Sequence, residues 1–261
     1  MNVPDTQIAV TLFNLREYCK NESELDSTLD RLCEFGYKAV QVSAVPLPPE
    51  VIRKQLDKHN LYCCAAHEGI DMVKDPIAMI DKMQVLGCDF VALGAPPPEL
   101  RVPELAVCKE LAGIFNASGA KMLEKGIRLG YHNHHFEFQK VKENGKTFLE
   151  NFYDLTDKDC VFAELDVHWV TRGGGSPIAW INKVAGRMPV CHFKDFVMIN
   201  ENDPVYCEVG EGNLDWDSII KACNDTGVRF FSIEQDMPFP GRDIFTSVKM
   251  SIDNLHKMGV K

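Results

Sequence analysis

Short apolar runs alternate along the chain with longer helical patterns, at a spacing of about 30 residues that is typical of one strand–helix unit. The apolar runs predict strands that begin near Ile8, Ala39, Leu61, Phe90, Ile127, Val161, Val190 and Phe230. The longer patterns predict helices over 22–35, 49–59, 74–86, 101–125, 147–156, 176–185, 214–226 and 241–258. Strands that alternate with helices favour parallel pairing through right-handed crossovers.

Eight such units predict an α/β protein, a single (β/α)8 TIM barrel that occupies residues 1–261 as one domain. We see no linker, low-complexity tract or composition shift that would divide the chain. The alternative is an open, doubly wound sheet, which would carry a glycine-rich loop after its first strand. Here the first predicted strand is followed by Asn-Leu-Arg-Glu at 14–17, without a glycine, and this favours the barrel.

Composition narrows the classes of partner. The chain has 261 residues, is 45% apolar and carries a formal net charge of −10. An acidic protein is a poor ligand for nucleic acid or for an anionic membrane surface, so we expect neither as a partner. No apolar run has the length of a membrane helix, and the first residues lack a signal-peptide pattern. The ten cysteines include no C-x-x-C pair, so we expect reduced thiols and a cytoplasmic protein.

Ionisable residues gather at the predicted strand ends, which is where TIM barrels carry their chemistry. They are His67 and Glu68 after the third strand, His132, His134, His135 and Glu137 after the fifth, Glu164, Asp166 and His168 in the sixth, His192, Lys194 and Asp195 in the seventh, and Glu234 and Asp236 in the eighth. Residues two apart in a strand share a face, so many of these side chains would point together into the barrel mouth. Such a concentration predicts one divalent cation, of which Mn, Co, Zn and Mg are candidates, or a polar substrate.

Five ordered motifs then reveal a family resemblance. They are YHNHHFEF (131–138), ELDVHWVTRGGGSPIAWI (164–181), HFKD (192–195), VGEGNLDW (209–216) and SIEQD (232–236). Together they resemble the sugar-phosphate isomerase/epimerase family, within the xylose-isomerase-like TIM barrel superfamily. The resemblance covers essentially the whole chain.

The resemblance implies one divalent metal ion at the barrel mouth. Carried over by motif, three of its ligands are Asp166, His192 and Glu234. The fourth position departs from the family, because His132 stands where the epimerases have a glutamate. The Tyr-His-Asn-His run is instead similar to that of the inosose dehydratase branch.

The resemblance also implies proton abstraction next to a carbonyl through a metal-stabilised enediolate, the chemistry of sugar isomerases and epimerases. Our hypothesis makes Glu234 both a metal ligand and a base, with Glu164 or His134 as the second acid/base. Lys194 would stabilise the developing oxyanion. Further substrate contacts are predicted for His67, His168, Trp169 and Glu137.

Two other functions stay open at this stage. One is an inosose-dehydratase-like lyase acting on a keto-sugar or cyclitol, which is motivated by His132. The other is a non-catalytic carbohydrate-binding barrel. In each case the expected partner is a small sugar-like molecule, and a homo-oligomer is compatible with the sequence.

Overall fold

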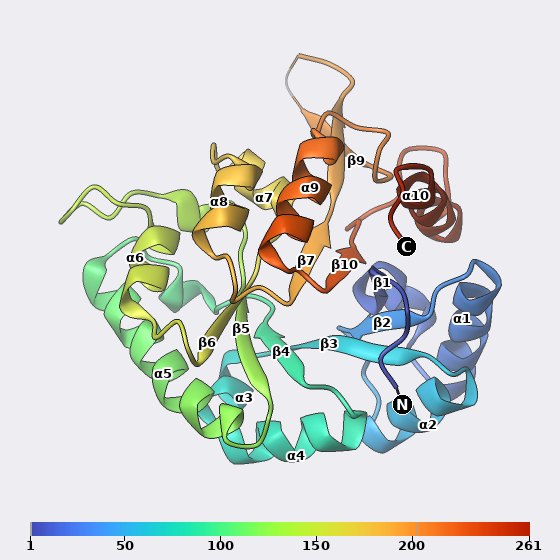
Figure 1. The fold of residues 1–261 in the computed structure, drawn as a ribbon, viewed down its shortest axis with the longest axis horizontal. Helices are drawn as coiled ribbons and strands as arrows, with labels where there is room; N and C mark the ends of the chain where they lie inside the picture. Colours follow the sequence, from blue (N-terminus) through green and yellow to red (C-terminus); the bar gives the residue numbers. More distant parts are fainter. Residues whose placement is uncertain (1, 202) are drawn as a thin grey trace.

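The computed structural model describes residues 2–201 and 203–261 and has a barrel of parallel strands at its centre (Figure 1). The barrel strands are β1 (Ile8–Thr11), β2 (Ala39–Val42), β3 (Tyr62–Glu68), β4 (Phe90–Leu93), β5 (Arg128–His132), β6 (Val161–Glu164), β7 (Val190–Phe193) and β10 (Phe230–Ile233). They pair in the order β6-β5-β4-β3-β2-β1-β10-β7. The eight strands predicted from the apolar runs are thereby confirmed, and so is the TIM barrel.

The sheet nearly closes between its two end strands, β6 and β7. The amide of His192 donates to the carbonyl of Leu165 at 2.8 Å, and Asp166 and His192 form an isolated parallel bridge. The amide of Ala163 donates to the carbonyl of Arg187 at 2.8 Å. This closure brings Asp166, just past β6, beside His192 in β7.

The barrel interior changes from apolar to polar along the strand direction. Its apolar part is a separate small cluster formed by Ala9, Ala39, Cys64, Ala65, Phe90, Ala92, Val190 and Phe230, with Tyr62 and Phe162 against it. Two residues further along the same strands stand Gln41, Glu164 and His192, all fully buried. Because side chains two apart share a face, the polar group lies directly above the apolar cluster.

Helices cover the outside of the barrel (Figure 1). They are α1 (Glu22–Glu34), α2 (Pro49–Lys58), α3 (Ile70–Lys74), α4 (Pro76–Leu86), α5 (Leu105–Leu123), α6 (Phe148–Leu155), α7 (Val167–Arg172), α8 (Pro177–Lys183), α9 (Trp216–Thr226) and α10 (Ile244–Lys257). Short 3-10 turns are η1 (Leu12–Tyr18), η2 (Pro98–Leu100) and η3 (Phe136–Phe138). Each predicted helical range contains a helix, although helix 101–125 begins only at Leu105.

One expectation about the sixth strand is wrong. We placed Glu164, Asp166 and His168 on one face of a continuous strand, but β6 ends at Glu164. Asp166 instead caps α7, where its Oδ1 accepts a hydrogen bond from the amide of Trp169 at 3.1 Å. Aspartate favours this capping role, and it turns the chain into a helix that begins at Val167 and carries His168.

A β-hairpin in the long segment after β7 was not predicted. Its strands, β8 (Asp195–Met198) and β9 (Pro204–Cys207), pair antiparallel and project beyond the surrounding helices (Figure 1). Tyr206 of β9 packs its ring against that of His168, with centroids 5.2 Å apart. The hairpin therefore covers one side of the polar group at the strand ends.

The first strand and the C-terminus meet beside the barrel (Figure 1). The amide of Gln7 donates to the carbonyl of Lys261 at 2.7 Å. Among the described residues, no helix is both long and apolar enough to cross a membrane.

Candidate metal centre and active site

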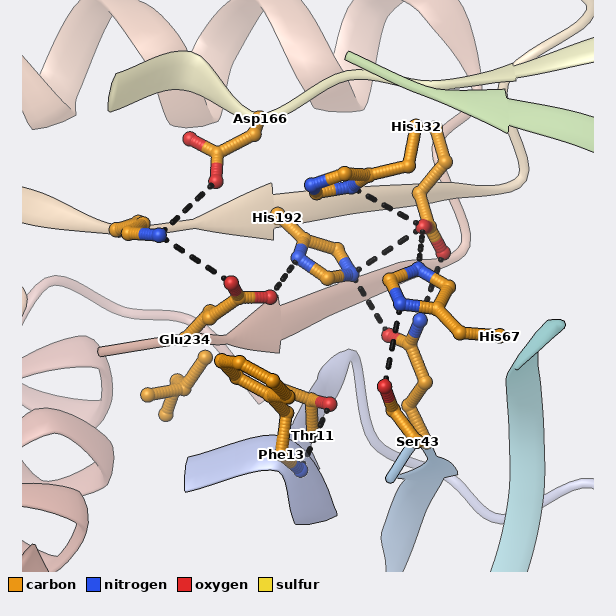
Figure 2. A network of polar contacts seen from close by, with 12 residues as sticks. Thr11, Phe13, Ser43, His67, His132, Asp166, His192 and Glu234 are labelled. Carbon is orange, nitrogen blue, oxygen red and sulfur yellow. Dashed lines mark hydrogen bonds and ion pairs between the residues drawn. The ribbon is translucent and has the colours of Figure 1, made fainter. Parts of the chain in front are cut away.

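Four potential metal ligands converge at the carboxyl ends of the strands. One donor atom from each of His132, Asp166, His192 and Glu234 lies within 4.8 Å of the others, and Figure 2 shows the four side chains reaching toward one another. His132 ends β5, His192 lies in β7, and Asp166 and Glu234 follow β6 and β10. The set is the one that the sequence motifs suggested, and its four residues come from strand ends that are neighbours around the barrel.

Glu164 lies beneath these four residues as the centre of a buried polar network. Its Oε2 lies 3.3 Å from His132 Nδ1 and 3.4 Å from His192 Nε2. Nε2 of His67 contacts the same oxygen. The other oxygen, Oε1, accepts from Nε2 of Gln41 at 3.1 Å. Glu164 is fully buried, so its charge is compensated by these neighbours rather than by water.

The network shifts the pKa values of its members in different directions. Burial opposes the ionised form of Glu164, yet His67 and His192 hold the pKa of this carboxyl well below its usual range. Burial also opposes the charged form of His192, but Glu164 and Glu234 raise its pKa to about 10. Burial raises the pKa of Asp166 to about 7, against the attraction of Lys194. Burial and the neighbouring His192 lower the pKa of His132 to about 4.

Lys194 is buried and lies next to two members of the four-ligand set, Asp166 and Glu234. Its Nζ lies 3.2 Å from Glu234 Oε1, 2.7 Å from Asp236 Oδ1 and 3.9 Å from Asp166 Oδ2. The same ammonium stands 4.6 Å from the ring centroid of Trp169, a cation–π distance. Lys194 is thus held between three carboxylates.

A cavity of about 330 Å³ opens above this group. It is lined by Phe13, Ser43, Ala44, His67, Gly94, Ala95, His132, His134, Glu234 and Asp236. A volume of this size is in the range of small-molecule sites. A wider depression beside it shares Ala44 and His67 and is bordered by Arg16, Lys20 and Lys82.

His134 faces the cavity, whereas Glu137 lies behind it. Burial and the neighbouring His132 lower the pKa of His134 to about 2, so its imidazole is neutral at neutral pH. Glu137 is fully buried, and it accepts from the hydroxyl of Tyr131 at 2.9 Å and from the amide of His134 at 2.8 Å. These contacts fix the turn that presents His134.

His168 and Trp169 stand beside the centre on α7. His168 is fully buried among the rings of Trp169, Phe196 and Tyr206, and neither of its nitrogens has a hydrogen-bond partner within the described chain. Trp169 is half-buried and its ring centroid lies 5.6 Å from that of His134. His135, which we counted among the ionisable residues at the strand ends, is exposed.

The chemistry of the four-ligand set fits a divalent cation. Two imidazoles and two carboxylates are a donor combination that first-row divalent metals accept. Oδ2 of Asp166 is buried without a hydrogen-bond partner in the described chain, and Nζ of Lys194 lies 3.9 Å from it. Buried polar atoms are rarely left unpartnered, so this oxygen points to a ligand.

Sequence reasoning missed Gln41 and Ser43. Gln41 bonds both Glu164 and His192, and the hydroxyl of Ser43 lies 3.3 Å from Nδ1 of His67. Gln41 could have been found, because it is an isolated amide in the otherwise apolar strand Ala-Val-Gln-Val. Ser43 lies just beyond that strand and gives no comparable signal.

The fold and the site together define a TIM barrel with a cluster of His and carboxylate side chains at its mouth that could hold a metal ion. The sequence model of the family described as xylose isomerase-like TIM barrel matches residues 29–246. The chain belongs to this family, whose members include sugar-modifying isomerases, epimerases and dehydratases.

Individual relatives are distant. An inosose dehydratase of Clostridium beijerinckii is 21% identical over 242 residues, which cover 78% of this chain and 79% of the relative. The structure of a sugar phosphate isomerase/epimerase from Parabacteroides distasonis superposes with a TM-score of 0.81 at 21% identity and covers 97% of this chain and 94% of that one. A xylose isomerase-like barrel from Mycobacterium smegmatis in complex with magnesium has a TM-score of 0.74 at 14% identity, covering 97% and 96%.

Proposed function

We propose that the protein is a divalent-metal-dependent sugar isomerase or epimerase that removes a proton next to a carbonyl group. The observation that carries the proposal is the set of His132, Asp166, His192 and Glu234 beside the buried Lys194, of which His132 and Glu234 line a cavity of about 330 Å³. A cation held by the four ligands would polarise the carbonyl of a bound keto-sugar. This would lower the pKa of the C–H group on the neighbouring carbon and make its proton easier to remove.

The residues around this position have complementary tasks. Glu234 lines the cavity and takes the proton from the carbon next to the carbonyl. Nζ of Lys194, 3.2 Å from Glu234 Oε1, donates to the substrate oxygen on which negative charge develops. The result is an enediolate, whose fate depends on where the proton returns.

The second acid/base is His134 in this proposal. The sequence left Glu164 and His134 as alternatives, and of the two only His134 borders the cavity. Its imidazole is neutral, and in this proposal it exchanges a proton with the face of the substrate opposite to Glu234. Return to the opposite face of the same carbon gives an epimer, and return to the adjacent carbon gives an isomer.

Substrate contacts are proposed for four residues, which differ in how directly a molecule in the cavity could reach them. His67 lines the cavity, and Trp169 offers a ring face for stacking on sugar C–H groups. His168 has two unpartnered nitrogens for substrate hydroxyls if the neighbouring rings give way. Glu137, fully buried behind His134, would act on substrate through the position of that imidazole.

A second candidate function is a lyase that eliminates water from a keto-sugar or cyclitol. It is favoured by His132 at the position of the usual glutamate, and by the named activity of the relatives, inosose dehydratases. The same proton removal would then be followed by loss of a hydroxyl from the next carbon.

Mass spectrometry in deuterium oxide separates these reactions. The protein, supplied with Mn²⁺ or Co²⁺, is incubated with a panel of ketoses, keto-sugars and inososes. Isomerisation or epimerisation conserves the mass apart from deuterium incorporated from solvent, whereas dehydration removes one water. Absence of exchange and of product across the panel, in a protein that binds the cation, would favour the carbohydrate-binding alternative.

The assignment of Glu234 is tested with Glu234→Gln, which keeps the shape of the side chain. We expect turnover to fall by about 10³-fold or more, because both the base and a ligand charge are lost. Circular dichroism should report an unchanged fold. A variant that retains full turnover would rule out Glu234 as the base.

A further inference from the structure

Two overlapping sets of ligands exist at the strand ends. Besides the set with Asp166 and Glu234, donor atoms of His67, His132, Glu164 and His192 also lie within 4.8 Å of one another. His132 and His192 belong to both sets. A neutral imidazole has one lone pair, so each of these two rings can direct it to one set at a time. The hydrogen bonds of the network decide which set that is.

The protonation of His192 follows from a chain of obligatory donors and acceptors. The amide nitrogen Nε2 of Gln41 donates to Oε1 of Glu164 at 3.1 Å. The amide oxygen of Gln41 then faces Nε2 of His192 at 2.8 Å. An amide oxygen cannot donate, so Nε2 of His192 carries the proton. Nδ1 is therefore the nitrogen of His192 that could give its lone pair to a cation. It lies 2.5 Å from Oε2 of Glu234, to which it donates a second proton, and a cation bound on that side would displace this proton (Figure 2).

The protonated nitrogen of His132 is likewise set by the acceptor that it faces, which is Glu164. Its Nδ1 lies 3.3 Å from Glu164 Oε2 and is the ring nitrogen directed toward the carboxylate (Figure 2). A proton on Nδ1 satisfies that oxygen and leaves the lone pair at Nε2. Histidine ligands in metal sites commonly donate their second nitrogen to a carboxylate in this way.

We propose that Glu164 and Gln41 form a positioning pair that fixes the tautomers of both histidine ligands, with the proton on Nδ1 of His132 and on Nε2 of His192. The pair directs both lone pairs to the set with Asp166 and Glu234. It thereby excludes the set with His67 as a cation site. This inference rests on the metal site of the proposed function, and it gives Glu164 a positioning role in place of the acid/base role considered from the sequence.

The buried surroundings of Glu164 agree with this role. Three imidazoles and the amide of Gln41 occupy its two oxygens, and it is absent from the lining of the cavity. A group so enclosed reaches substrate only through the ligands that it orients.

Metal affinity provides the first test. Isothermal titration with Co²⁺ is carried out on the wild type, on Glu164→Gln and on Gln41→Met. We expect the dissociation constant to rise about 10- to 100-fold in both variants, the usual effect of losing such a partner. Glu208→Gln is the matched control, since Glu208 is also fully buried and bonds Ser247 and Arg242, away from the ligands. Its dissociation constant should equal that of the wild type.

A second pair of variants distinguishes the two sets of ligands. Asp166→Asn should lose Co²⁺ binding, while His67→Gln should keep one Co²⁺ per chain with an affinity within a few fold of the wild type. The reverse outcome, loss in His67→Gln and retention in Asp166→Asn, would overturn the inference. A stoichiometry of two in the wild type would overturn it as well.

The tautomers can be read in the wild type without any substitution. Long-range ¹H–¹⁵N spectra of the Zn²⁺-loaded, ¹⁵N-histidine-labelled protein should show the proton of His132 on Nδ1 and that of His192 on Nε2. The opposite tautomer at either ring would refute the positioning role. A wild type that binds neither Co²⁺ nor Zn²⁺ would instead overturn the metal site and the proposed function, so the two failures are distinguishable.

Discussion

At the scale of single residues, Lys194 balances the charge of the candidate centre. Its buried ammonium lies within 4 Å of carboxylate oxygens of Asp166, Glu234 and Asp236. Removing one partner from a buried ionic group leaves uncompensated charge, which costs more than the loss of a surface pair. Lys194 therefore contributes to stability as well as to the proposed reaction.

Replacing Lys194 by Met should destabilise the metal-free protein by about 3 kcal/mol or more, because the carboxylates beside it lose their counter-charge. Saturating Mn²⁺ should restore part of the loss, since the cation neutralises Asp166 and Glu234. Urea unfolding with and without Mn²⁺ measures both effects. Lys249→Met, which removes a half-exposed pair with Asp253, is the control and should change stability by less than about 1 kcal/mol. Equal losses in the two variants would contradict the prediction.

Glu137 makes a contribution to stability that depends on pH. Burial raises the pKa of this carboxyl from 4.5 to about 7, so the folded protein favours the protonated form. The associated stability is fully present below pH 4.5 and is lost as the pH rises through 7. The loss amounts to about 3 kcal/mol over this interval.

Glu137→Gln should remove that dependence. Relative to the wild type, the free energy of unfolding of the variant should increase by up to about 3 kcal/mol between pH 4.5 and pH 8, since an amide does not ionise. Denaturant titrations at a series of pH values provide the measurement. A difference between variant and wild type that stays constant with pH would refute a raised pKa at Glu137.

At the scale of elements, the hairpin β8–β9 depends on one carboxylate at its base. Asp195 Oδ2 accepts from the amides of Gly210 and Gly212 at 3.0 and 3.1 Å and from Nε1 of Trp216 at 2.6 Å. Its Oδ1 accepts from the amide of Phe196 at 2.8 Å. A Cβ at Gly212 would collide with the Asp195 side chain, so glycine is required for this close approach.

Asp195→Ala should cost about 3 kcal/mol or more, because several buried donors lose their acceptor together. Loosening of the hairpin should appear as faster amide hydrogen exchange across β8 and β9, detected by mass spectrometry. Glu201→Ala, an exposed change in the same hairpin segment, should alter neither quantity appreciably. Unchanged exchange in Asp195→Ala would show that the hairpin is held by other contacts.

At the scale of the whole molecule, the barrel brings the candidate metal ligands together from distant parts of the chain. His132 and Glu234 are separated by about a hundred residues, and only the closed sheet brings them together. A cation that binds this assembled site, and not the unfolded chain, must stabilise the native state.

Addition of Mn²⁺ or Co²⁺ at about 100 times its dissociation constant should add about 2.7 kcal/mol of stability. For a chain of this size the midpoint of thermal unfolding should rise by about 5–10 °C. Asp166→Asn should abolish the rise, while its amide still caps α7. Chelation should reverse the rise in the wild type, and the exposed Asp217→Asn should preserve it. A rise of the same size in Asp166→Asn would place the cation elsewhere.

The order of the strands and the location of the chemistry were predictable from the sequence. Apolar runs at regular spacing mark buried parallel strands, and eight of them, without a glycine-rich loop after the first, favour a barrel over an open doubly wound sheet. Polar residues that follow such runs lie at one edge of the sheet, and the resemblance of the motifs to a known family then singled out His132, Asp166, His192 and Glu234 among them. The ligand roles themselves remain predictions.

Local geometry at the ends of the strands was not predictable in the same way. The alternation of side chains along a strand led us to extend β6 through His168. That pattern says nothing about the capping hydrogen bond of Asp166, which begins α7. The hairpin was not predicted because its short strands, β8 and β9, pair with each other and lie outside the repeating strand–helix units.

The sequence by itself determined the barrel and the gathering of His and carboxylate side chains at its mouth, since both follow from the periodicity of buried positions along one chain. Only the tertiary structure decided which hydrogen bonds those side chains make with one another. Gln41 and Glu164 are 123 positions apart, and Gln41 and His192 are 151 apart, yet they share one network of hydrogen bonds. Which nitrogen of a histidine is protonated depends on the acceptor that it faces, and that neighbour is fixed by the closure of the barrel.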